Sequence, residues 1–292
     1  MAKIEDAYSE AFDGLYSRIV VTAIDDKRLK KAAYGATALP STVFNRSEGG
    51  IERWLSEEET VDGRKGAILQ IWVIQGRSAE KTLENELAWR IRQGILVVPT
   101  TSVFNLLESE EKFDMTIKVG HCGDGYEYTD RHYGSERIRI PIMMGEFTIE
   151  RYLGYSKGVM GGNIWLMCKT QKAALEAGEK AVQAINNIEG VITPFDICSA
   201  GSKTQTNYPE IGPTTNHPYC PTLKTKYSGS MVPDGVKSIP EIVINGVSLE
   251  KVKMAMKAAI YAVKDLNDVI RVSAGNYGGE LGKYKIFLHE FI

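Results

Sequence analysis

The chain has 292 residues, of which 43% are hydrophobic and 25% are charged, and its formal net charge is −2 at pH 7. This composition is typical of a soluble globular protein, and the length suits two domains better than one. The nearly balanced charge argues against nucleic-acid binding, and no apolar run approaches the roughly 20 residues of a membrane-spanning helix. We therefore expect a cytoplasmic protein with no nucleic-acid partner and no membrane partner.

The residues that can bind metals are scattered along the chain. The glycine-rich stretch 120–134 contains two histidines and a cysteine, but their spacing matches no common set of metal ligands. We expect a turn that leads into a hairpin there, and no metal site. The four cysteines form no CxxC pair, and without a secretory signal we expect them to be reduced. They are Cys122, Cys168, Cys198 and Cys220.

The first half of the chain predicts two pairs of a strand and a helix. Residues 17–39 combine an apolar strand with an amphipathic helix, and a second pair begins at residue 70, where Ser78 is expected to cap the helix. The apolar run "ILVVPTT" at 95–101 predicts the next strand. The segment 115–157 is rich in glycine and tyrosine, and we expect it to form a hairpin and the crossover to the second half.

The second half repeats this layout. Residues 162–185 predict a strand and a helix, a further pair begins at residue 238 with Ser248 as helix cap, and 269–276 predict a last strand. Between them, the long polar segment 198–237 is rich in Gly, Pro, Thr and Asn, and we expect it to help build a site. The buried stripe of the first of these helices is predicted to contain Leu175, Gly178, Val182 and Ile185.

An internal repeat relates the two halves. Laying Trp72–Lys81 over Ile242–Lys251 matches Val, Ile, Gly, Ser, Glu and Lys at six of ten positions. The pattern predicts an α+β fold of two ferredoxin-like (split βαβ) lobes, in which helices cover one face of an antiparallel sheet. We expect an N-terminal lobe over residues 1–149 and a C-terminal lobe over residues 150–292 that carries the active site.

Glu241 stands at the head of an apolar strand, where the other copy of the repeat has Ile71. The scaffold therefore accepts a hydrophobic residue there, and folding alone does not demand a carboxylate. Glu241 is interpreted as a solvated residue at a strand start, a salt-bridge partner or a catalytic acid/base, and the repeat favours the last. Desolvation at the mouth of an apolar strand raises the pKa of a glutamate, which suits proton transfer near neutral pH.

Three glycine-containing stretches lie in the same half as Glu241, at 158–163, 198–203 and 273–279. None of them is a GxGxxG or Walker motif, so support for a nucleotide-phosphate site is weak. Ordinary turn chemistry explains any one of them. Together they would let a ligand approach the backbone and would offer N–H donors to an oxyanion.

Ordered blocks of sequence carry a resemblance to a known family along nearly the whole chain. They are "EDAYSEAFD" (5–13), "ETVDGRKG" (59–66), "VPTTSVFN" (98–105), "DGYE" (124–127), "GVMGGN" (158–163), "IEGVITPF" (188–195), "PYCPTL" (218–223), "VPDGVK" (232–237), "EIVING" (241–246) and "SAGNYGGELGKY" (273–284). In these blocks the chain resembles the formylmethanofuran:tetrahydromethanopterin formyltransferases.

The resemblance implies transfer of a formyl group from formylmethanofuran to N5 of tetrahydromethanopterin, with no metal and no bound prosthetic group. It also implies two ferredoxin-like lobes, a homotetramer built from dimers, and Glu241 at the reaction centre. Lys203 is expected to meet a carboxylate on the methanofuran tail. The substrate-binding candidates are Gly161, Gly162, Asn163, Ser202, Lys203, Asn216, Ser273, Asn276 and Tyr277.

The sequence departs from the family pattern in its loops. Pro40 replaces a glycine-rich stretch, "PFDICSAGSK" at 194–203 is shorter than its family counterpart, and Pro240 replaces an aromatic residue before the glutamate. Three interpretations therefore stay open. The chain is an active formyltransferase, a diverged paralogue (with another formyl donor or acceptor, or as a non-catalytic subunit of a one-carbon complex), or a ligand-binding regulatory protein. The retained Glu241 favours the first, and the shortened loop favours the second.

Overall fold

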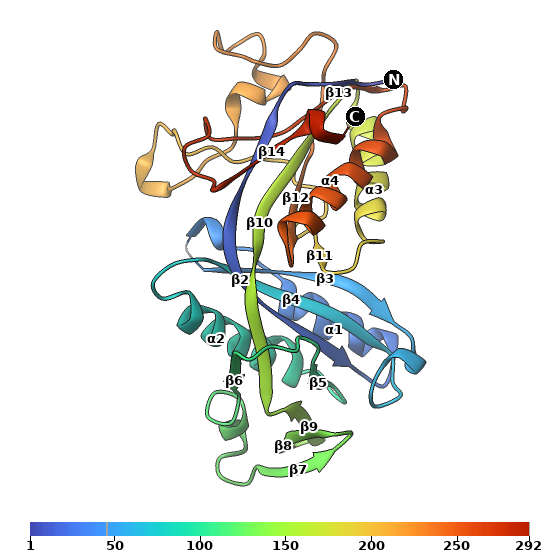
Figure 1. Ribbon diagram of the computed structural model, residues 1–292, viewed down its shortest axis with the longest axis vertical. Coiled ribbons are helices and arrows are strands. Elements are labelled where there is room, and N and C mark those ends of the chain that lie inside the picture. The colour runs from blue at the N-terminus through green and yellow to red at the C-terminus, as the bar shows by residue number, and fades with distance from the viewer. Residues whose placement is uncertain (45, 292) are drawn as a thin grey trace. The chain divides into compact units, whose positions relative to one another are not determined.

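The structure is a computed structural model that describes residues 1–44 and 46–291. Its contacts divide the chain into two compact units: unit 1 comprises Met1–Asp13 and Gly158–Ile292, and unit 2 comprises Gly14–Lys157. Two long strands, β2 (Tyr8–Thr22) and β10 (Tyr152–Cys168), run across this division (Figure 1). The first thirteen residues thus belong with the C-terminal half, whereas a boundary between residues 149 and 150 was expected from the sequence.

Unit 2 is built on an antiparallel sheet with two helices. Its sheet order is β3-β4-β2-β5, and all three of these pairings are antiparallel. Beyond β5, which pairs in parallel with β9, the hairpin strands β9, β8 and β7 extend the sheet. The elements of unit 2 besides the end of β2 are α1 (Asp26–Thr37), β3 (Ser47–Leu55), β4 (Gly66–Ile74), α2 (Ala79–Arg90), β5 (Ser102–Asn105), β6 (Lys112–Asp114), β7 (Tyr128–His132), β8 (Ser135–Ile142) and β9 (Gly145–Glu150).

The predicted strand at 95–101 is wrong. Helix α2 continues into a π-helix, Ile91–Leu96, a turn follows, and β5 begins only at Ser102. The reason lies in the spacing, because Leu87, Ile91 and Ile95 recur every four residues and all three are buried in the core of unit 2. The π-helix approaches α1 closely, since a Cβ added to Gly94 would lie 2.6 Å from the backbone nitrogen of Ala36.

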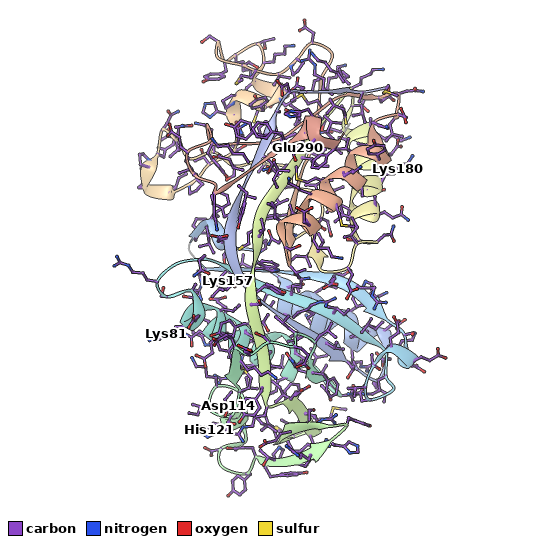
Figure 2. The ribbon with its side chains drawn as sticks, in the orientation of Figure 1. Lys81, Asp114, His121, Lys157, Lys180 and Glu290 are labelled. Atoms are coloured by element: carbon purple, nitrogen blue, oxygen red, sulfur yellow. The ribbon has the colours of Figure 1, made fainter. Side chains whose placement is uncertain are left out.

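The hairpins predicted in the middle of the chain are confirmed. Residues 120–123 form a short 3-10 helix, and the strands β7, β8 and β9 pair in sequence as antiparallel neighbours. His121, labelled in Figure 2, lies in this helix, and its Nε2 atom is 3.8 Å from Oε1 of Glu127. Among the described residues, no group of three or more His, Cys, Asp or Glu side chains has the arrangement of a metal site. Within residues 1–44 and 46–291, no helix is long and apolar enough to span a membrane.

Unit 1 has the same succession of elements. Its sheet order is β1-β13-β10-β12-β11, with β1 parallel to β13 and the other pairs antiparallel. The strand β14 pairs with the first residues of β2. The elements of unit 1 besides β10 are β1 (Lys3–Ile4), α3 (Gln171–Ile185), β11 (Val191–Ile192), β12 (Glu241–Gly246), α4 (Leu249–Val263), β13 (Val269–Ser273) and β14 (Tyr284–Phe287).

The two faces of the unit 1 sheet have different covers. Ile164 and Leu166 of β10 pack with helices α3 and α4, which lie side by side in Figure 1. Because side chains alternate along a strand, Trp165 and Met167 point to the opposite face, where they pack with Val232 of the long segment 198–237. This segment therefore closes the sheet face that the helices leave open.

The predicted stripe on α3 is only partly right. Gly178 and Ile185 are buried as expected, but the side chain of Leu175 is 57% exposed. Alanines form most of the buried face instead, which allows α3 to pack closely against α4. The buried residues of α3 are Ala173, Ala174, Ala177, Gly178, Ala181 and Ile185.

Candidate active site

Glu241 is the first residue of β12, and strand geometry decides where its side chain points. Ile242 and Ile244 pack into the helix-covered core, so Glu241 lies on the opposite face of the sheet. Its register partner on β10 is Trp165, which lies on that same face. The carboxyl group is buried under the long segment, since the residue is only 8% exposed.

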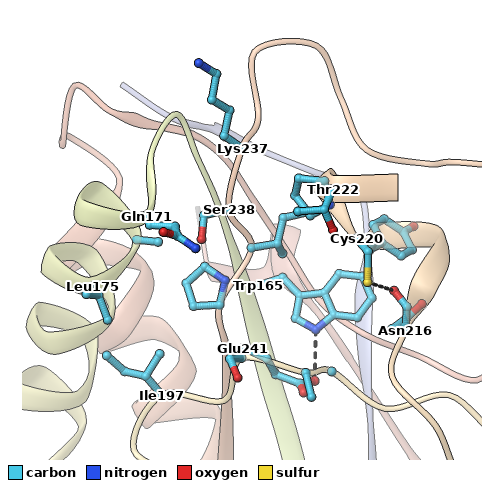
Figure 3. A pocket seen from close by; sticks show the side chains of 18 residues that line it. Trp165, Gln171, Leu175, Ile197, Asn216, Cys220, Thr222, Lys237, Ser238 and Glu241 are labelled. Carbon is cyan, nitrogen blue, oxygen red and sulfur yellow. Dashed lines mark hydrogen bonds between the residues drawn. The ribbon is translucent and has the colours of Figure 1, made fainter. Parts of the chain in front are cut away.

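Two side chains hold the carboxyl group of Glu241. The indole Nε1–H of Trp165 donates a hydrogen bond of 3.0 Å to Oε1, drawn as a dashed line in Figure 3. The side chain of Cys198 also interacts with the carboxyl group and lowers its pKa. The backbones of Cys198 and Glu241 also exchange two N–H···O=C bonds of 2.8 and 2.9 Å. The shortened loop thus places its cysteine directly beside the candidate acid.

Burial raises the pKa of the Glu241 carboxyl above its ordinary value, and the hydrogen bonds from Trp165 and Cys198 offset part of this effect. No cation is among the groups that shift it. A larger share of the carboxyl groups is therefore protonated near neutral pH than in an exposed glutamate. This is the protonation state in which Glu241 can donate a proton or a hydrogen bond.

A cavity of about 490 Å³ opens beside Glu241. Figure 3 shows Gln171 and Leu175 of α3 on one wall, with Asn216 and Cys220 of the long segment on the other. The ring of Tyr219 stands edge-on to Trp165, with 4.6 Å between the ring centroids. The lining thus combines apolar side chains with hydrogen-bonding side chains that could orient a small molecule.

The cavity carries charge at two places. Of the described side chains that line it, only Glu241 and Lys237 are ionisable as a carboxylate or an amine. Glu241 is buried, whereas Lys237 is exposed and extends away from the wall in Figure 3. The site therefore combines a buried acid with an exposed cation that is suited to an anionic group of a ligand.

The loop 274–283 brings a tyrosine close to this acid. The pKa of Tyr277 is raised by burial and further by the nearby charge of Glu241, while a hydrogen bond from Ser202 lowers it. Glu10 of β2 anchors the loop: its buried carboxylate accepts hydrogen bonds from the backbone N–H groups of Tyr277, Leu281 and Gly282, the last two at 3.2 Å. The hydrogen bond from the Tyr277 N–H to Glu10 thus fixes the backbone position of this residue.

The structure places the sequence-predicted residues in three groups. Glu241 and Asn216 line the cavity, and Ser202 and Tyr277 lie together next to Glu241. Lys203 belongs to the long segment, where its backbone exchanges hydrogen bonds of 2.9 and 3.0 Å with Thr214. Three of these residues therefore belong to the long segment 198–237, Glu241 follows shortly after it, and Tyr277 comes from the loop 274–283.

The other predicted residues have contacts within the fold. The amide of Asn163 donates to the carbonyl oxygen of Gly275 at 3.1 Å and accepts from its N–H at 2.6 Å, which joins β10 to the loop 274–283. Gly161 has a positive φ of 82°, and a Cβ on Gly162 would lie 2.4 Å from Val252 of α4. Ser273 ends β13, and Asn276 is exposed and bonds the Tyr8 carbonyl at 3.3 Å.

Three residues near Glu241 were not among the candidates selected from the sequence, namely Trp165, Cys198 and Lys237. Tyr219 lies in the long segment that was expected to help build a site, and its ring contacts Trp165. One signal was available for Cys198, because it stands in the loop that departs from the family pattern. For Trp165 the signal was the pairing of β10 with β12, which period-two alternation alone does not specify.

Comparison with known proteins supports one family over the entire chain. A family model described as "Formylmethanofuran-tetrahydromethanopterin formyltransferase" matches residues 1–142, and a second, described as "FTR, proximal lobe", matches residues 145–291. The chain belongs to this formyltransferase family. The resemblance inferred from the sequence blocks is therefore confirmed.

Two relatives from one organism differ in how similar they are to this formyltransferase-family chain. A "formylmethanofuran--tetrahydromethanopterin formyltransferase-like protein" of Archaeoglobus fulgidus is 61% identical, covering 99% of this chain and 96% of the relative. The protein of the same organism named "formylmethanofuran--tetrahydromethanopterin formyltransferase" is 40% identical, covering 99% and 97%. The chain is thus more similar to the formyltransferase-like relative.

Solved structures of the family match the chain over its length. The formylmethanofuran:tetrahydromethanopterin formyltransferase of Methanosarcina barkeri is 40% identical, with a TM-score of 0.92 over 100% of this chain and 98% of that chain. The formyltransferase/hydrolase complex of Methylorubrum extorquens, solved with methylofuran, contains a chain that is 33% identical, with a TM-score of 0.90 over 99% and 96%. The expected mixed α+β fold is confirmed by these matches.

Proposed function

We propose that this chain is a formyltransferase that moves the formyl group of formylmethanofuran to N5 of tetrahydromethanopterin. The observation that carries the proposal is the buried carboxyl group of Glu241, held beside a mostly apolar cavity in a member of this family. Relatives that bear the name of this activity are about 40% identical over the full chain. The two coenzymes are substrates, and the proposal includes no prosthetic group.

The raised pKa of Glu241 suits both proton transfers of this reaction. N5 attacks the formyl carbon, a C–N5 bond forms, and the carbonyl oxygen becomes an oxyanion that needs hydrogen-bond donors. The bond from carbon to the methanofuran nitrogen then breaks, and that nitrogen must gain a proton to leave. Protonated Glu241 donates this proton and afterwards takes up the one that N5 releases, so that the carboxyl group is restored.

Other side chains are proposed to position the substrates. Tyr277, whose backbone is fixed by Glu10, presents its hydroxyl group near Glu241 and Ser202. Lys203 and Lys237 are candidates for the carboxylates of the methanofuran tail, since Lys237 lies at the cavity and Lys203 on the same long segment. Holding two bulky coenzymes in register supplies up to about 7–11 kcal/mol of catalysis in favourable cases.

From the strand topology of each unit, we propose that both units are ferredoxin-like lobes. Both units place their four main strands in the spatial order second-third-first-fourth with antiparallel neighbours, which is the pattern of a ferredoxin-like lobe. The lobes at 1–149 and 150–292 remain a prediction beside the division found from contacts. The proposed homotetramer rests on the family resemblance, and light scattering tests it against the 32.4 kDa chain mass.

A diverged paralogue is the second candidate. The sequence identities to named relatives favour it. In Methanothermobacter thermautotrophicus, too, the formyltransferase-like relative is more similar to this chain than the formyltransferase, with 50% against 42% identity. The cysteine that touches Glu241 lies in a loop that departs from the family pattern. Such a paralogue would use Glu241 on another formyl donor or acceptor, or would serve as a non-catalytic subunit.

A formyl-transfer assay tests the proposal. Purified protein is incubated with formylmethanofuran and tetrahydromethanopterin, and the 5-formyl product is followed for wild type, Glu241→Gln and Glu250→Gln. Glu250 lies exposed at the start of α4, so this variant removes the same charge outside the cavity. We expect activity in wild type and Glu250→Gln, and a loss of about 100-fold or more in Glu241→Gln.

The other outcomes separate the alternatives. A folded wild type that forms no 5-formyl product from these coenzymes contradicts the proposed reaction. If that protein still binds one coenzyme in calorimetry, the paralogue becomes the better account. Equal activity of wild type and Glu241→Gln would keep the formyl transfer but remove Glu241 from it.

A further inference from the structure

Unit 2 contains a second cavity, of about 450 Å³, which shares no lining residue with the cavity beside Glu241. Its walls come from β5, from the hairpin strands β7 to β9, and from the loops around Asp62 and Thr100. Hydroxyl and guanidinium groups dominate these walls. The proposed formyl transfer uses none of them.

Arg137 of β8 is the unusual member of this wall. It is only 2% exposed, and its guanidinium group lies between the rings of Phe104 and Tyr133, at 5.0 and 4.3 Å from their centroids. Its Nε and Nη2 atoms are buried, and neither has a hydrogen-bond partner among the described residues. The two aromatic rings thus contact the guanidinium group but provide no hydrogen-bond acceptor for Nε and Nη2.

The two other arginines that line this cavity have hydrogen-bond acceptors, unlike the Nε and Nη2 atoms of Arg137. Arg64 donates to Asp62, Thr22 and Ser102 at 2.6 to 2.9 Å. Arg139 donates to Asp130 at 2.9 Å and to Thr148 at 2.8 Å. A buried cation with two unmatched donors carries a large desolvation cost, and the aromatic rings against it do not replace the missing hydrogen bonds.

The flanking carboxylates do not fill this role. Asp130 and Glu150 favour the charged form of Arg137, but neither accepts a hydrogen bond from Nε or Nη2. The Nε–H and Nη2–H bonds of a guanidinium lie in one plane and point in the same direction, which matches two oxygens of a carboxylate or a phosphate. An oxyanion is therefore the chemical group that would accept hydrogen bonds from both unmatched donors of Arg137.

A second buried atom adds to the description of the ligand. Oδ1 of Asp62 is buried without a hydrogen-bond partner among the described residues, and Asp62 lines the same cavity. A carboxylate oxygen only accepts hydrogen bonds, so it calls for a hydroxyl or amine donor. The cavity volume is at the small end of the range for small-molecule sites.

We propose that this cavity binds a small hydroxylated anion, whose carboxylate or phosphate group is held by Arg137 and whose hydroxyl group donates to Asp62. Tyr133, whose ring contacts the guanidinium group, is half exposed, lies in the turn between β7 and β8, and has a positive φ of 53°. Because Nε and Nη2 of Arg137 are buried, a neighbouring side chain must move for the anion to reach them, and we assign this movement to the ring of Tyr133.

Titration calorimetry of the full chain tests this site with four probes. Inorganic phosphate and acetate carry the anionic group alone, and glycerol 3-phosphate and glycerate carry it together with hydroxyl groups. The buffer is Tris, free of phosphate, carboxylates and sulfonates. We expect saturable binding of one anion per chain, tighter for the hydroxylated member of each pair, and the better pair identifies the phosphate or carboxylate class.

Matched variants assign the binding to Arg137. Arg137→Met removes the guanidinium group, and Arg137→Lys keeps a positive charge without the paired Nε–H and Nη2–H donors. The control, Arg92→Met, removes a cation from an exposed position of unit 2 that does not line the cavity. We expect both Arg137 variants to weaken binding at least tenfold and Arg92→Met to leave it unchanged. Arg137→Lys keeps the test valid if Arg137→Met fails to fold.

Two results would overturn the proposal. The first is the lack of saturable binding of any of the four probes by wild type at millimolar concentration. The second is equal binding by wild type and a folded Arg137 variant. Equal affinity for plain and hydroxylated probes would overturn the part assigned to Asp62. Formyl-transfer activity plays no part in this readout, so its outcome is independent of the proposed function.

Discussion

At the scale of single residues, the internal repeat allows Glu241 to be compared with the equivalent position in the other unit. Ile71, its counterpart in β4, is 1% exposed, and so the same structural position holds a hydrophobic residue in unit 2 and a carboxyl group in unit 1. Burying a carboxyl group costs free energy that a hydrophobic side chain does not. The fold of unit 1 tolerates this cost at a position where its own repeat shows an alternative.

The pH dependence of stability should reveal this cost. The pKa of Glu241 is raised in the folded protein, so its contribution to stability is present below the unfolded pKa of about 4.3 and is lost as pH rises through the folded pKa. Glu241→Gln does not titrate, and we expect it to gain stability relative to wild type as the pH rises from the unfolded pKa to the folded pKa, by about 1.4 kcal/mol for each unit by which the pKa is raised.

Thermal unfolding at fixed chain concentration measures this difference. Glu250→Gln serves as the control, since its carboxylate is exposed and its curve should run parallel to that of wild type. Parallel curves for wild type and Glu241→Gln would show that the carboxyl group is not desolvated as the structure indicates.

Trp165 should tune the protonation of Glu241. Its Nε1–H hydrogen bond lowers the pKa of the carboxyl group, so Trp165→Phe is expected to raise that pKa further while keeping a ring against Tyr219. The pH profile of kcat/KM should then move to higher pH, together with a lower maximum. Trp89→Phe, at an exposed position, should leave the profile in place, and a shift of equal size in both variants would count against the hydrogen bond.

The sequence identified Glu241, Ser202 and Tyr277 as candidates, but not Trp165 and Cys198. The repeat compares two strands residue by residue, which exposes a carboxylate where a hydrophobic residue is also tolerated. Trp165 and Cys198 reach Glu241 through strand pairing and a loop contact, and such long-range contacts leave no local pattern in composition or period. The same holds for Arg137, whose unmatched donors appear only once the hairpin is folded.

At the scale of elements, the loop 274–283 depends on a single carboxylate. Glu10 accepts three backbone hydrogen bonds from this loop, and Glu10→Gln would turn an amide donor toward N–H groups. We expect a loss of about 1–3 kcal/mol in stability and faster hydrogen exchange over residues 276–282. Glu280→Gln changes the charge of the same loop at an exposed position and should not have this effect. Unchanged exchange in Glu10→Gln would show that the loop is held by other contacts.

Predictions of elements succeeded where the periodicity was unambiguous. The helices α3 and α4 and the strand β13 were predicted, and Ser248 caps α4 by accepting from the Lys251 N–H at 3.2 Å. Ser78 stands at the start of α2 without a capping hydrogen bond. The run "ILVVPTT" failed because β-branched residues favour strands, whereas burial against α1 extended the helix.

At the scale of the whole molecule, unit 1 is assembled from the two ends of the chain. Ala2 and Ala11 are buried in its core, β1 pairs with β13, and Glu10 anchors the loop 274–283. A chain that begins at Gly14 is therefore expected to lose protection from hydrogen exchange across β13 and this loop. Peptides of unit 2, which has its own core, should keep most of theirs. Full protection of β13 in the shortened chain would contradict this dependence.

The parallel pairing of Lys3 with Arg271 also has a consequence for the order of events during synthesis. The two strands are separated by roughly 270 residues, and at about 5–20 residues per second the first waits on the order of 15–50 s for its partner to be translated. The whole of unit 2 emerges from the ribosome during that interval. The residues of β1 and the first residues of β2, which pair with β14, therefore wait for partners that are translated late, and a chaperone that shields a newly made chain would find its target in these residues.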